Sequence, residues 1–238
     1  MNISIVGTGR AGASFFTALT RAGHRVQLVH HDEIDDLGPS DLVLLCVPDG
    51  ALEETAARLT PRATQVVAHC AGSLTLDVLG AHPRVASLHP LATLPSPERG
   101  AQRLVGATYC VAGDALIGEV VRSLHGRTIT LDDDQRTLYH ATAAVAANHL
   151  VALMGHVTRL ADAAGLRFED FVPLARMALE DAAEMGPVRA LTGPASRGDM
   201  ATIDAHLGAM AESERATYVA MANAALALAE HRHEASLA

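Results

Sequence analysis

The chain has 238 residues, of which 49% are hydrophobic, and this is enough for a packed core in one large domain or two smaller ones. Its formal net charge of -9 and the lack of a dense Lys/Arg run argue against nucleic acid as a partner, because phosphates are bound by a basic face. Without a leader peptide or a run of about 18 apolar residues, we expect a cytoplasmic protein that does not enter the membrane.

Apolar stretches alternate with helical patterns over the first half of the chain, as in a doubly wound sheet. An apolar run over 3–6 ends in Gly7, and a periodic stretch over 11–21 follows it, which predicts strand, turn and helix. Asp49 is expected to cap a further helix over 50–59. The pattern predicts seven strands, over 3–6, 25–29, 41–47, 64–68, 84–88, 108–111 and 127–131.

From Asp132 onward the pattern is helical throughout. Three aspartates at 132–134 can cap a long Ala-rich helix that reaches about Ala164, and helical patterns follow over 169–185, 199–211 and 213–232. We therefore predict an α/β fold in which a doubly wound parallel Rossmann sheet precedes an all-helical C-terminal domain. The predicted boundaries are 1–131 for the NAD(P)-binding domain and 132–238 for a helical domain that binds substrate and forms dimers.

A G-x-G-x-x-G motif follows the first predicted strand and opens the first predicted helix, the setting in which it binds a dinucleotide. Its glycines would allow a tight turn, close approach of pyrophosphate and close packing of helix on strand, and the helix N-terminus would hold the phosphates. A glycine turn without a ligand is the alternative. The predicted cofactor-binding residues of the motif are Gly7, Thr8, Gly9, Arg10, Ala11 and Gly12.

The second strand would end near His30, where NAD-binding sites usually carry an acidic residue for the ribose 2′-hydroxyl. Residues 30–32 are His, His and Asp, so the sequence favours NADP over NAD, with His31 in contact with the 2′-phosphate. Two solvated loop histidines are the competing interpretation.

Two histidines follow apolar runs directly, at the edge of an open parallel sheet where ligands bind. His69 and His89 could each donate a proton or hydrogen bond to a substrate oxygen, or be satisfied within a loop. Ser73 could bind the nicotinamide amide or a substrate carboxylate, although capping of the next helix is the simpler expectation. Neither the histidine nor the cysteine spacing matches a metal motif, so no metal is predicted.

Several short motifs are shared with one family. The chain resembles bacterial proteins that join a Rossmann domain to a helical domain of the ketopantoate reductase and 6-phosphogluconate dehydrogenase type. The resemblance covers nearly the whole chain and rests on the glycine motif, Val47-Pro48-Asp49, His69-Cys70-Ala71-Gly72-Ser73-Leu74, Ser87-Leu88-His89-Pro90-Leu91, Tyr139-His140, Ala147-Asn148-His149, Leu191-Thr192-Gly193-Pro194 and Arg197-Gly198-Asp199.

The resemblance implies NADP or NAD as cofactor, with Val47 and Pro48 among the residues that bind it. It also implies a homodimer and a small substrate with a carboxylate, which Arg197 could bind. Asn148 matches the family's substrate-positioning Asn, whereas Ala144 replaces the usual catalytic Lys. His140 precedes Asn148 by about two helical turns and could supply the proton instead. For His140 the alternative is a structural histidine. Arg197 could instead close onto the cofactor phosphates, or cap the neighbouring helix through Asp199.

Three functions are compatible with these residues. The resemblance favours NAD(P)H-dependent reduction of a small oxo acid, an oxidoreductase acting on CH-OH donors, with ketopantoate (2-dehydropantoate) as the preferred substrate. Loss of the Lys favours an imine reductase of the pyrroline-carboxylate type, because an already protonated nitrogen needs no Lys acid. A protein that binds NADP and regulates without turnover is the third.

Overall fold

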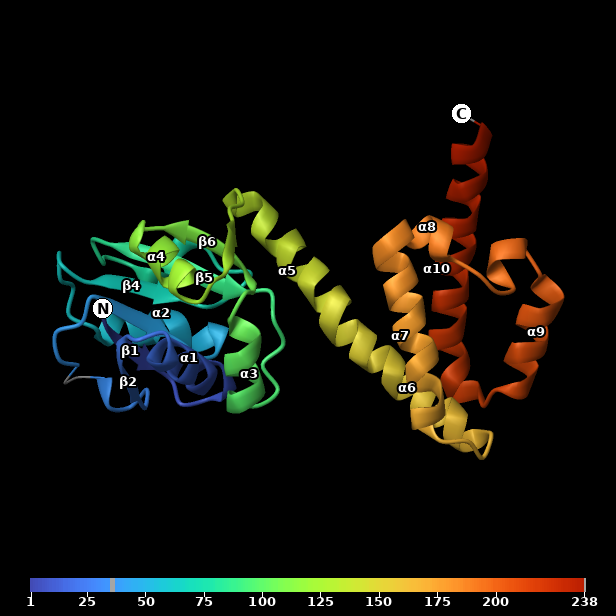
Figure 1. Ribbon diagram of the computed structural model, residues 1–238, viewed down its shortest axis with the longest axis horizontal. Coiled ribbons are helices and arrows are strands. Elements are labelled where there is room, and N and C mark those ends of the chain that lie inside the picture. The colour runs from blue at the N-terminus through green and yellow to red at the C-terminus, as the bar shows by residue number, and fades with distance from the viewer. Residues whose placement is uncertain (35–36, 238) are drawn as a thin grey trace. The chain divides into compact units, whose positions relative to one another are not determined.

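Seven strands form a single sheet in the order β2-β1-β3-β4-β5-β6-β7 (Figure 1). The structure is a computed structural model that describes residues 1–34 and 37–237, with side chains as far as His231. All seven predicted strands are confirmed. They are β1 (Asn2–Val6), β2 (Arg25–Val29), β3 (Leu42–Leu45), β4 (Val66–His69), β5 (Val85–Pro90), β6 (Thr108–Gly113) and β7 (Arg127–Ile129).

One strand pair departs from the predicted parallel arrangement. β5 and β6 are antiparallel, with His89 opposite Cys110, whereas every other neighbouring pair is parallel. The apolar pattern of a strand reports its burial and not its direction, so the sequence could not distinguish the two. The carboxyl ends of β1, β3, β4 and β5 therefore share one edge of the sheet, and β6 begins at that edge.

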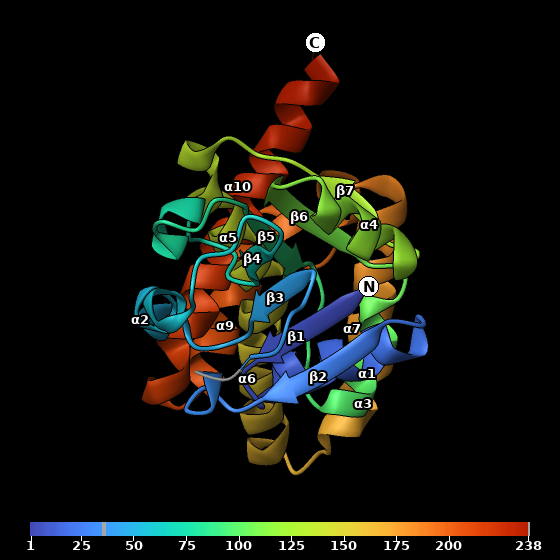
Figure 2. The same cartoon turned by 90° about the vertical axis from the view of Figure 1, so that its left-hand side faces the viewer.

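Helices cover both faces of the sheet (Figure 2). Alternate strand residues such as Ile5 and Leu44 pack with α1, α3 and α4 in one core cluster. Val43 and Leu45 point the other way and pack with α2 and η3 in a second cluster. Burial on both faces explains the nearly continuous apolar runs of the central strands. The helical elements are α1 (Arg10–Arg21), η2 (Asp49–Ala51), α2 (Leu52–Arg58), η3 (Leu76–Leu79), α3 (Pro97–Leu104) and α4 (Leu116–Ser123).

The expected cap at Asp49 is wrong. Asp49 is the first residue of the 3-10 turn η2, Ala51 precedes α2, and neither element has a side-chain cap. The proline before Asp49 ends the strand segment as predicted, but the chain enters a 3-10 turn before the α-helix, which moves Asp49 away from the capping position.

In the turn between β1 and α1, backbone segments approach one another so closely that a Cβ atom has no room. Gly7 has a φ of +111°, and a Cβ there would lie 2.5 Å from the carbonyl oxygen of Cys46. A Cβ at Gly12 would lie 1.8 Å from the carbonyl oxygen of Gly7. Glycine at both positions therefore lets the start of α1 pack against the ends of β1 and β3.

The chain divides into two compact units, Met1–Ala147 and Asn148–Ala238. The predicted boundary at Leu131 lies earlier, because the first turns after it belong to the first unit. Arg136, at the start of α5 (Arg136–Ala144), is only 1% exposed, and its guanidinium donates to Leu74 O and Ser87 Oγ, each at 3.3 Å. These hydrogen bonds from a buried charge attach the start of α5 to the sheet. The change from strand to helix periodicity, on which the predicted boundary was based, gives no sign of such a contact.

The predicted long helix over 132–164 is helical over 133–163, but it is not one regular α-helix. It begins in the aspartate cluster with η4 (Asp133–Gln135) and continues as α5, but a π-helical turn, η5 (Val145–His149), lies between α5 and α6 (Leu150–Ala163). The predicted spacing of about two helical turns between His140 and Asn148 assumed a regular α-helix, and this premise does not hold across the π-helical turn.

The remaining helices confirm the predicted helical C-terminal segment. Two short elements lie between the predicted helical patterns over 169–185 and 199–211 and were not predicted, α8 and η6. Proline is well placed at the first turn of a helix, which explains why α8 begins at Pro187. The helices are α7 (Phe168–Met185), α8 (Pro187–Ala190), η6 (Ala195–Arg197), α9 (Met200–Ala209) and α10 (Glu212–Leu237).

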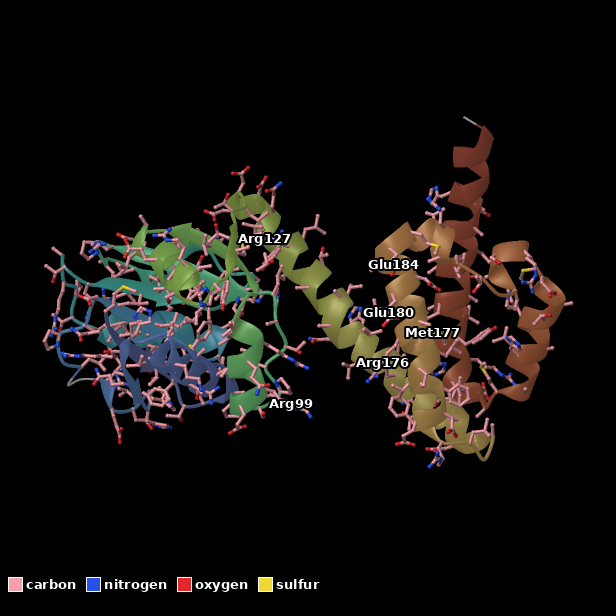
Figure 3. The ribbon with its side chains drawn as sticks, viewed as in Figure 1. Arg99, Arg127, Arg176, Met177, Glu180 and Glu184 are labelled. Carbon is pink, nitrogen blue, oxygen red and sulfur yellow. The ribbon has the colours of Figure 1, made fainter. Side chains whose placement is uncertain are left out.

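The second unit leaves large apolar side chains uncovered. No residue of α7 is buried, and Leu174 and Leu179 are 61% and 60% exposed. Figure 3 shows Arg176, Met177 and Glu180 on one side of this helix, so charged and apolar side chains mix there. The expected homodimer stays a prediction, and these exposed apolar side chains are candidates for its interface. Across residues 1–34 and 37–237, no helix has the length and apolar character needed to cross a bilayer.

Substitution of Gly12 tests the backbone packing. Gly12→Ala should lower the free energy of unfolding by about 1–3 kcal/mol, the usual cost of overpacking, because the new methyl would overlap the Gly7 carbonyl. Urea denaturation followed by circular dichroism measures this change. Gly9→Ala is the matched control, since a Cβ there would meet no atom within 4 Å. Equal stability of Gly12→Ala and the unsubstituted protein would contradict the packing argument.

Candidate functional site

The amino end of α1 is open. Gly9 is its N-cap residue, no side chain caps the helix, and its first turn holds no acidic residue. Thr8, Gly9 and Arg10 are exposed, and Ala11 is half-buried beside them. Backbone N–H groups and free space at a helix N-terminus are what a pyrophosphate requires, so this turn fits a dinucleotide.

The ends of β3 and β4 lie next to this turn. Cys46 and Cys70 follow the two strands, and a hydrogen bond with the Cys70 thiol, followed by burial, raises the pKa of Cys46 well above its ordinary value. Cys46 therefore stays a neutral thiol and is not a nucleophile. Val47 and Pro48 come next, and the backbone nitrogen of Val47 would lie 3.4 Å from a Cβ at Gly7. The predicted cofactor-binding role of Val47 and Pro48 is compatible with this placement.

His31 lies in the loop after β2. Its ring Nε2 is 3.3 Å from Asp32 Oδ1, and His30 Nδ1 is 3.3 Å from Asp32 Oδ2. Arg58 of α2 holds the loop by donating to the carbonyl oxygens of His31 (2.9 Å) and Asp32 (3.2 Å). The nitrogen and oxygen atoms of His30, His31 and Asp32 lie within 4.8 Å of one another, close enough to hold a cation, but the three residues are consecutive and open to solvent. The predicted contact of His31 with a 2′-phosphate stays a prediction.

His69 is a fully buried histidine whose two ring nitrogens both have partners. Nε2 lies 3.2 Å from the carbonyl oxygen of Thr75, and Nδ1 accepts from the backbone N–H of Ala71 at 3.2 Å. Burial lowers the pKa of His69, against the opposing effect of the Thr75 bond. This geometry is that of a residue that holds the loop after β4, and it leaves neither nitrogen free for a substrate.

His89 and His140 lie together beside Gly72. Their rings pack edge to face with centroids 5.8 Å apart. A Cβ at Gly72 would lie 2.7 Å from His140 Cδ2 and 2.9 Å from His89 Nε2, so glycine is what lets this loop approach both rings. The structure thus joins two of the predicted proton donors, one from β5 and one from α5, and adds Gly72, for which no separate role was predicted.

His89 is a neutral imidazole at physiological pH. Burial, then the charge on His140, lowers its pKa from 6.5 to about 4, and Arg136 and His69 act in the same direction while Asp49 opposes them. A neutral imidazole can donate or accept a hydrogen bond but does not act as an imidazolium acid. His140 is half-buried, and its side chain has no hydrogen bond within the described part of the chain.

Tyr139 is the site residue that sequence reasoning missed. Its hydroxyl lies 2.7 Å from His89 Nδ1, and the two rings pack edge to face with centroids 5.5 Å apart. The hydroxyl also has a hydrogen bond with the thiol of Cys110. The only signal in the sequence is that Tyr139 precedes His140 in one of the shared motifs.

Ser73 does not have the expected capping role. The next helical element, η3, begins at Leu76, and its N-cap residue is Thr75. The prediction failed because the two residues after Ser73 remain outside the helix. Ser73 is half-buried in the loop that also holds Gly72, and its contact with cofactor or substrate stays a prediction.

Two predicted residues belong to the second unit. Asn148 lies in the π-helical turn, and Arg197 is an exposed residue at the end of η6. Asp199, and not Arg197, caps α9 by accepting from the Thr202 backbone N–H at 3.1 Å. Hydrogen bonds from Thr202 lower the pKa of Asp199, and the charge of Arg197 contributes. Their predicted roles toward substrate stay predictions.

The fold and the glycine turn define a Rossmann-type α/β protein with a helical C-terminal unit. The model of a family described as a domain of unknown function, DUF2520, matches residues 107–225, half of the chain, and the chain belongs to this family. None of the curated proteins matches its sequence.

Solved structures with the same fold match nearly the whole chain. A Bacteroides fragilis protein named as a candidate NADP oxidoreductase has a TM-score of 0.79 and 22% identity, with 98% of each chain covered. A reductive aminase from Aspergillus terreus, in complex with NADPH and ethyl levulinate, has a TM-score of 0.69 and 16% identity over 94% of this chain and 93% of that one. A 1-pyrroline-5-carboxylate reductase from Streptococcus pyogenes has a TM-score of 0.63 and 13% identity over 95% and 98%.

The low pKa of His89 predicts a pH-dependent stability. As the pH falls, the unfolded chain takes up a proton at about 6.5 while the folded protein resists until about 4, so the stabilisation is complete above about pH 6.5 and is lost toward pH 4. His89→Gln should therefore make the fall in unfolding free energy over this window shallower. Urea denaturation at several pH values measures it.

His125→Asn is the control for that measurement, because His125 is exposed. It should leave the pH dependence of stability as it is in the unsubstituted protein. The same slope for His89→Gln and His125→Asn would show that His89 titrates at its ordinary pH.

Proposed function

We propose that this protein is an NADPH-dependent reductase of a small imine. The observation that carries the proposal is the combination, within one unit, of an open glycine turn at α1 and a pair of histidines at the carboxyl edge of the same sheet. In open α/β sheets this edge is where the cofactor and substrate bind. The names of the fold neighbours, a reductive aminase with NADPH and a pyrroline-carboxylate reductase, support a C=N substrate.

NADPH would supply a hydride to the substrate carbon. Gly9 leaves room for the pyrophosphate, and Thr8, Arg10 and Ala11 would donate backbone N–H groups from the turn. The preference for NADPH over NADH rests on the loop after β2, where His30 follows the strand and each carboxylate oxygen of Asp32 lies 3.3 Å from a ring nitrogen of His30 or His31. NAD remains the alternative cofactor of the proposal.

Reduction of C=N needs a proton on nitrogen as well as a hydride on carbon. His140 is the proton donor in our proposal, because its ring is half-buried, lies against the neutral His89 and is not tied to another residue by a hydrogen bond in the described chain. The family resemblance adds Asn148 as the residue that orients the substrate and Arg197 as the partner of a substrate carboxylate.

Reduction of a small oxo acid such as ketopantoate is the second candidate. It is favoured by the neutral state of His89, because a neutral imidazole N–H is a suitable donor to a carbonyl oxygen. The absence of a Lys at Ala144 weakens it, since the related enzymes use that Lys as acid.

Gly9→Ala tests the cofactor site. The methyl group would enter the space proposed for the pyrophosphate without touching the protein, so the dissociation constant for NADPH should rise about tenfold or more while stability is unchanged. Isothermal titration calorimetry and urea denaturation measure the two quantities. Gly208→Ala makes the same change in α9, where a Cβ also meets nothing within 4 Å, and should bind NADPH normally. Unaltered NADPH affinity of Gly9→Ala would count against the site.

A substrate panel tests the reaction itself. Oxidation of NADPH and NADH is followed with pyrroline carboxylates, other cyclic imines, ketopantoate and several 2-oxo acids, and we expect turnover on an imine. His140→Ala should reduce kcat by about 100-fold or more and leave the NADPH dissociation constant unchanged, since it removes a proton donor and no cofactor contact. Tight cofactor binding with no turnover on any compound would instead indicate a regulatory protein.

A further inference from the structure

His89 is attached to the protein interior through one ring nitrogen. His89 and Cys110 are register partners in the antiparallel pair of β5 and β6, so their side chains leave the same face of the sheet. Tyr139 of α5 lies over this face and bonds both, with 2.7 Å between its hydroxyl and His89 Nδ1. The three side chains therefore form a chain of hydrogen bonds from the buried thiol to the imidazole.

Each group in this chain keeps its proton. Burial raises the pKa of Cys110, and burial raises the pKa of Tyr139 far above its ordinary value, with Cys110 adding to the effect. A thiol, a phenol and a neutral imidazole therefore share two hydrogen bonds, and only the direction of donation is left to determine.

The strengths of the donors and acceptors fix that direction. A phenol O–H is a strong donor and a neutral imidazole nitrogen is a strong acceptor, whereas a thiol sulfur is a weak acceptor. The favoured arrangement has Tyr139 donating to His89 Nδ1 and the thiol of Cys110 donating to the Tyr139 oxygen. In the opposite arrangement the Tyr139 hydroxyl would donate to the Cys110 sulfur, a weak acceptor. The proton of the fully buried thiol would then have no acceptor.

We propose that Tyr139 is a positioning residue that fixes His89 in the tautomer with its proton on Nε2, so that the site presents a hydrogen-bond donor to the substrate. The catalytic meaning of this inference rests on the proposed reductase function. Nε2 lies beside Gly72, where a Cβ would be 2.9 Å from it, and it has no hydrogen-bond partner in the described part of the chain, so it is the ring nitrogen left for a substrate.

A donor at this position selects the substrate's protonation state. An unprotonated imine nitrogen or a carbonyl oxygen has a lone pair that can accept from Nε2–H, whereas a protonated iminium has only a proton to offer. The site would therefore take up the neutral imine through a hydrogen bond from His89, which keeps its proton, and His140 would supply the proton that the nitrogen gains during reduction. The charged or titratable groups that influence His89 are His140, Asp49, Arg136 and His69, and only Asp49 favours its protonation.

Nitrogen NMR of protein labelled at histidine determines the tautomer directly, without substrate. At pH about 7 we expect His89 to carry its proton on Nε2, and Tyr139→Phe should produce a mixture of both tautomers because Nδ1 loses its donor. Tyr218→Phe is the matched control, since the Tyr218 hydroxyl lies 2.6 Å from His206 Nδ1 in the second unit with rings 5.8 Å apart. A proton on Nδ1, or a tautomer unaffected by Tyr139→Phe, would overturn the inference.

Kinetics then separate positioning from structural support. On the best substrate of the panel, Tyr139→Phe should lower kcat by about 10- to 100-fold, with the NADPH dissociation constant and urea stability unchanged, whereas Tyr218→Phe should leave kcat unchanged. The loss should grow at higher pH, where neutral imine predominates. A shifted tautomer with normal kcat would overturn the positioning role, and a panel without turnover would refute the reductase proposal while the NMR result still decides the tautomer.

Discussion

Close approach of the backbone to other backbone and to two histidine rings, at one edge of the sheet, is the constraint on which this structure depends. Gly7, Gly12 and Gly72 each occupy a place where a Cβ would lie less than 3 Å from another atom. The first two bring α1 onto the strand ends, and the third brings the loop after β4 onto two histidine rings. Both parts of the candidate site, the cofactor turn and the histidine pair, therefore require glycine at these positions.

Much of the fold could be predicted because burial leaves a clear trace in the sequence. The strands that are covered on both faces, such as β3, have continuous apolar runs, and the glycine turn after β1 marks the first helix. The direction of β6 could not be predicted, because an apolar run has the same composition in either direction. The extent of the first unit was also hidden, since it depends on the burial of Arg136, a residue type that is normally exposed.

The candidate site was partly predictable for a related reason. A polar residue at the end of a buried strand stands out, and this rule found His69 and His89. It could not separate a histidine with both nitrogens occupied from one with a free nitrogen, because that depends on the loop conformation. The role of Tyr139 could not be predicted, because its partner Cys110 lies beside His89 only as a result of the antiparallel pairing of β5 and β6.

Arg136 gives this region a further property. Its guanidinium is enclosed beside Ser87, and after burial its charge is one of the influences that keep His69 and His89 uncharged. Burying one cation thus makes a second cation unfavourable at this edge of the sheet, which leaves the neighbouring imidazoles to act as neutral hydrogen-bonding groups.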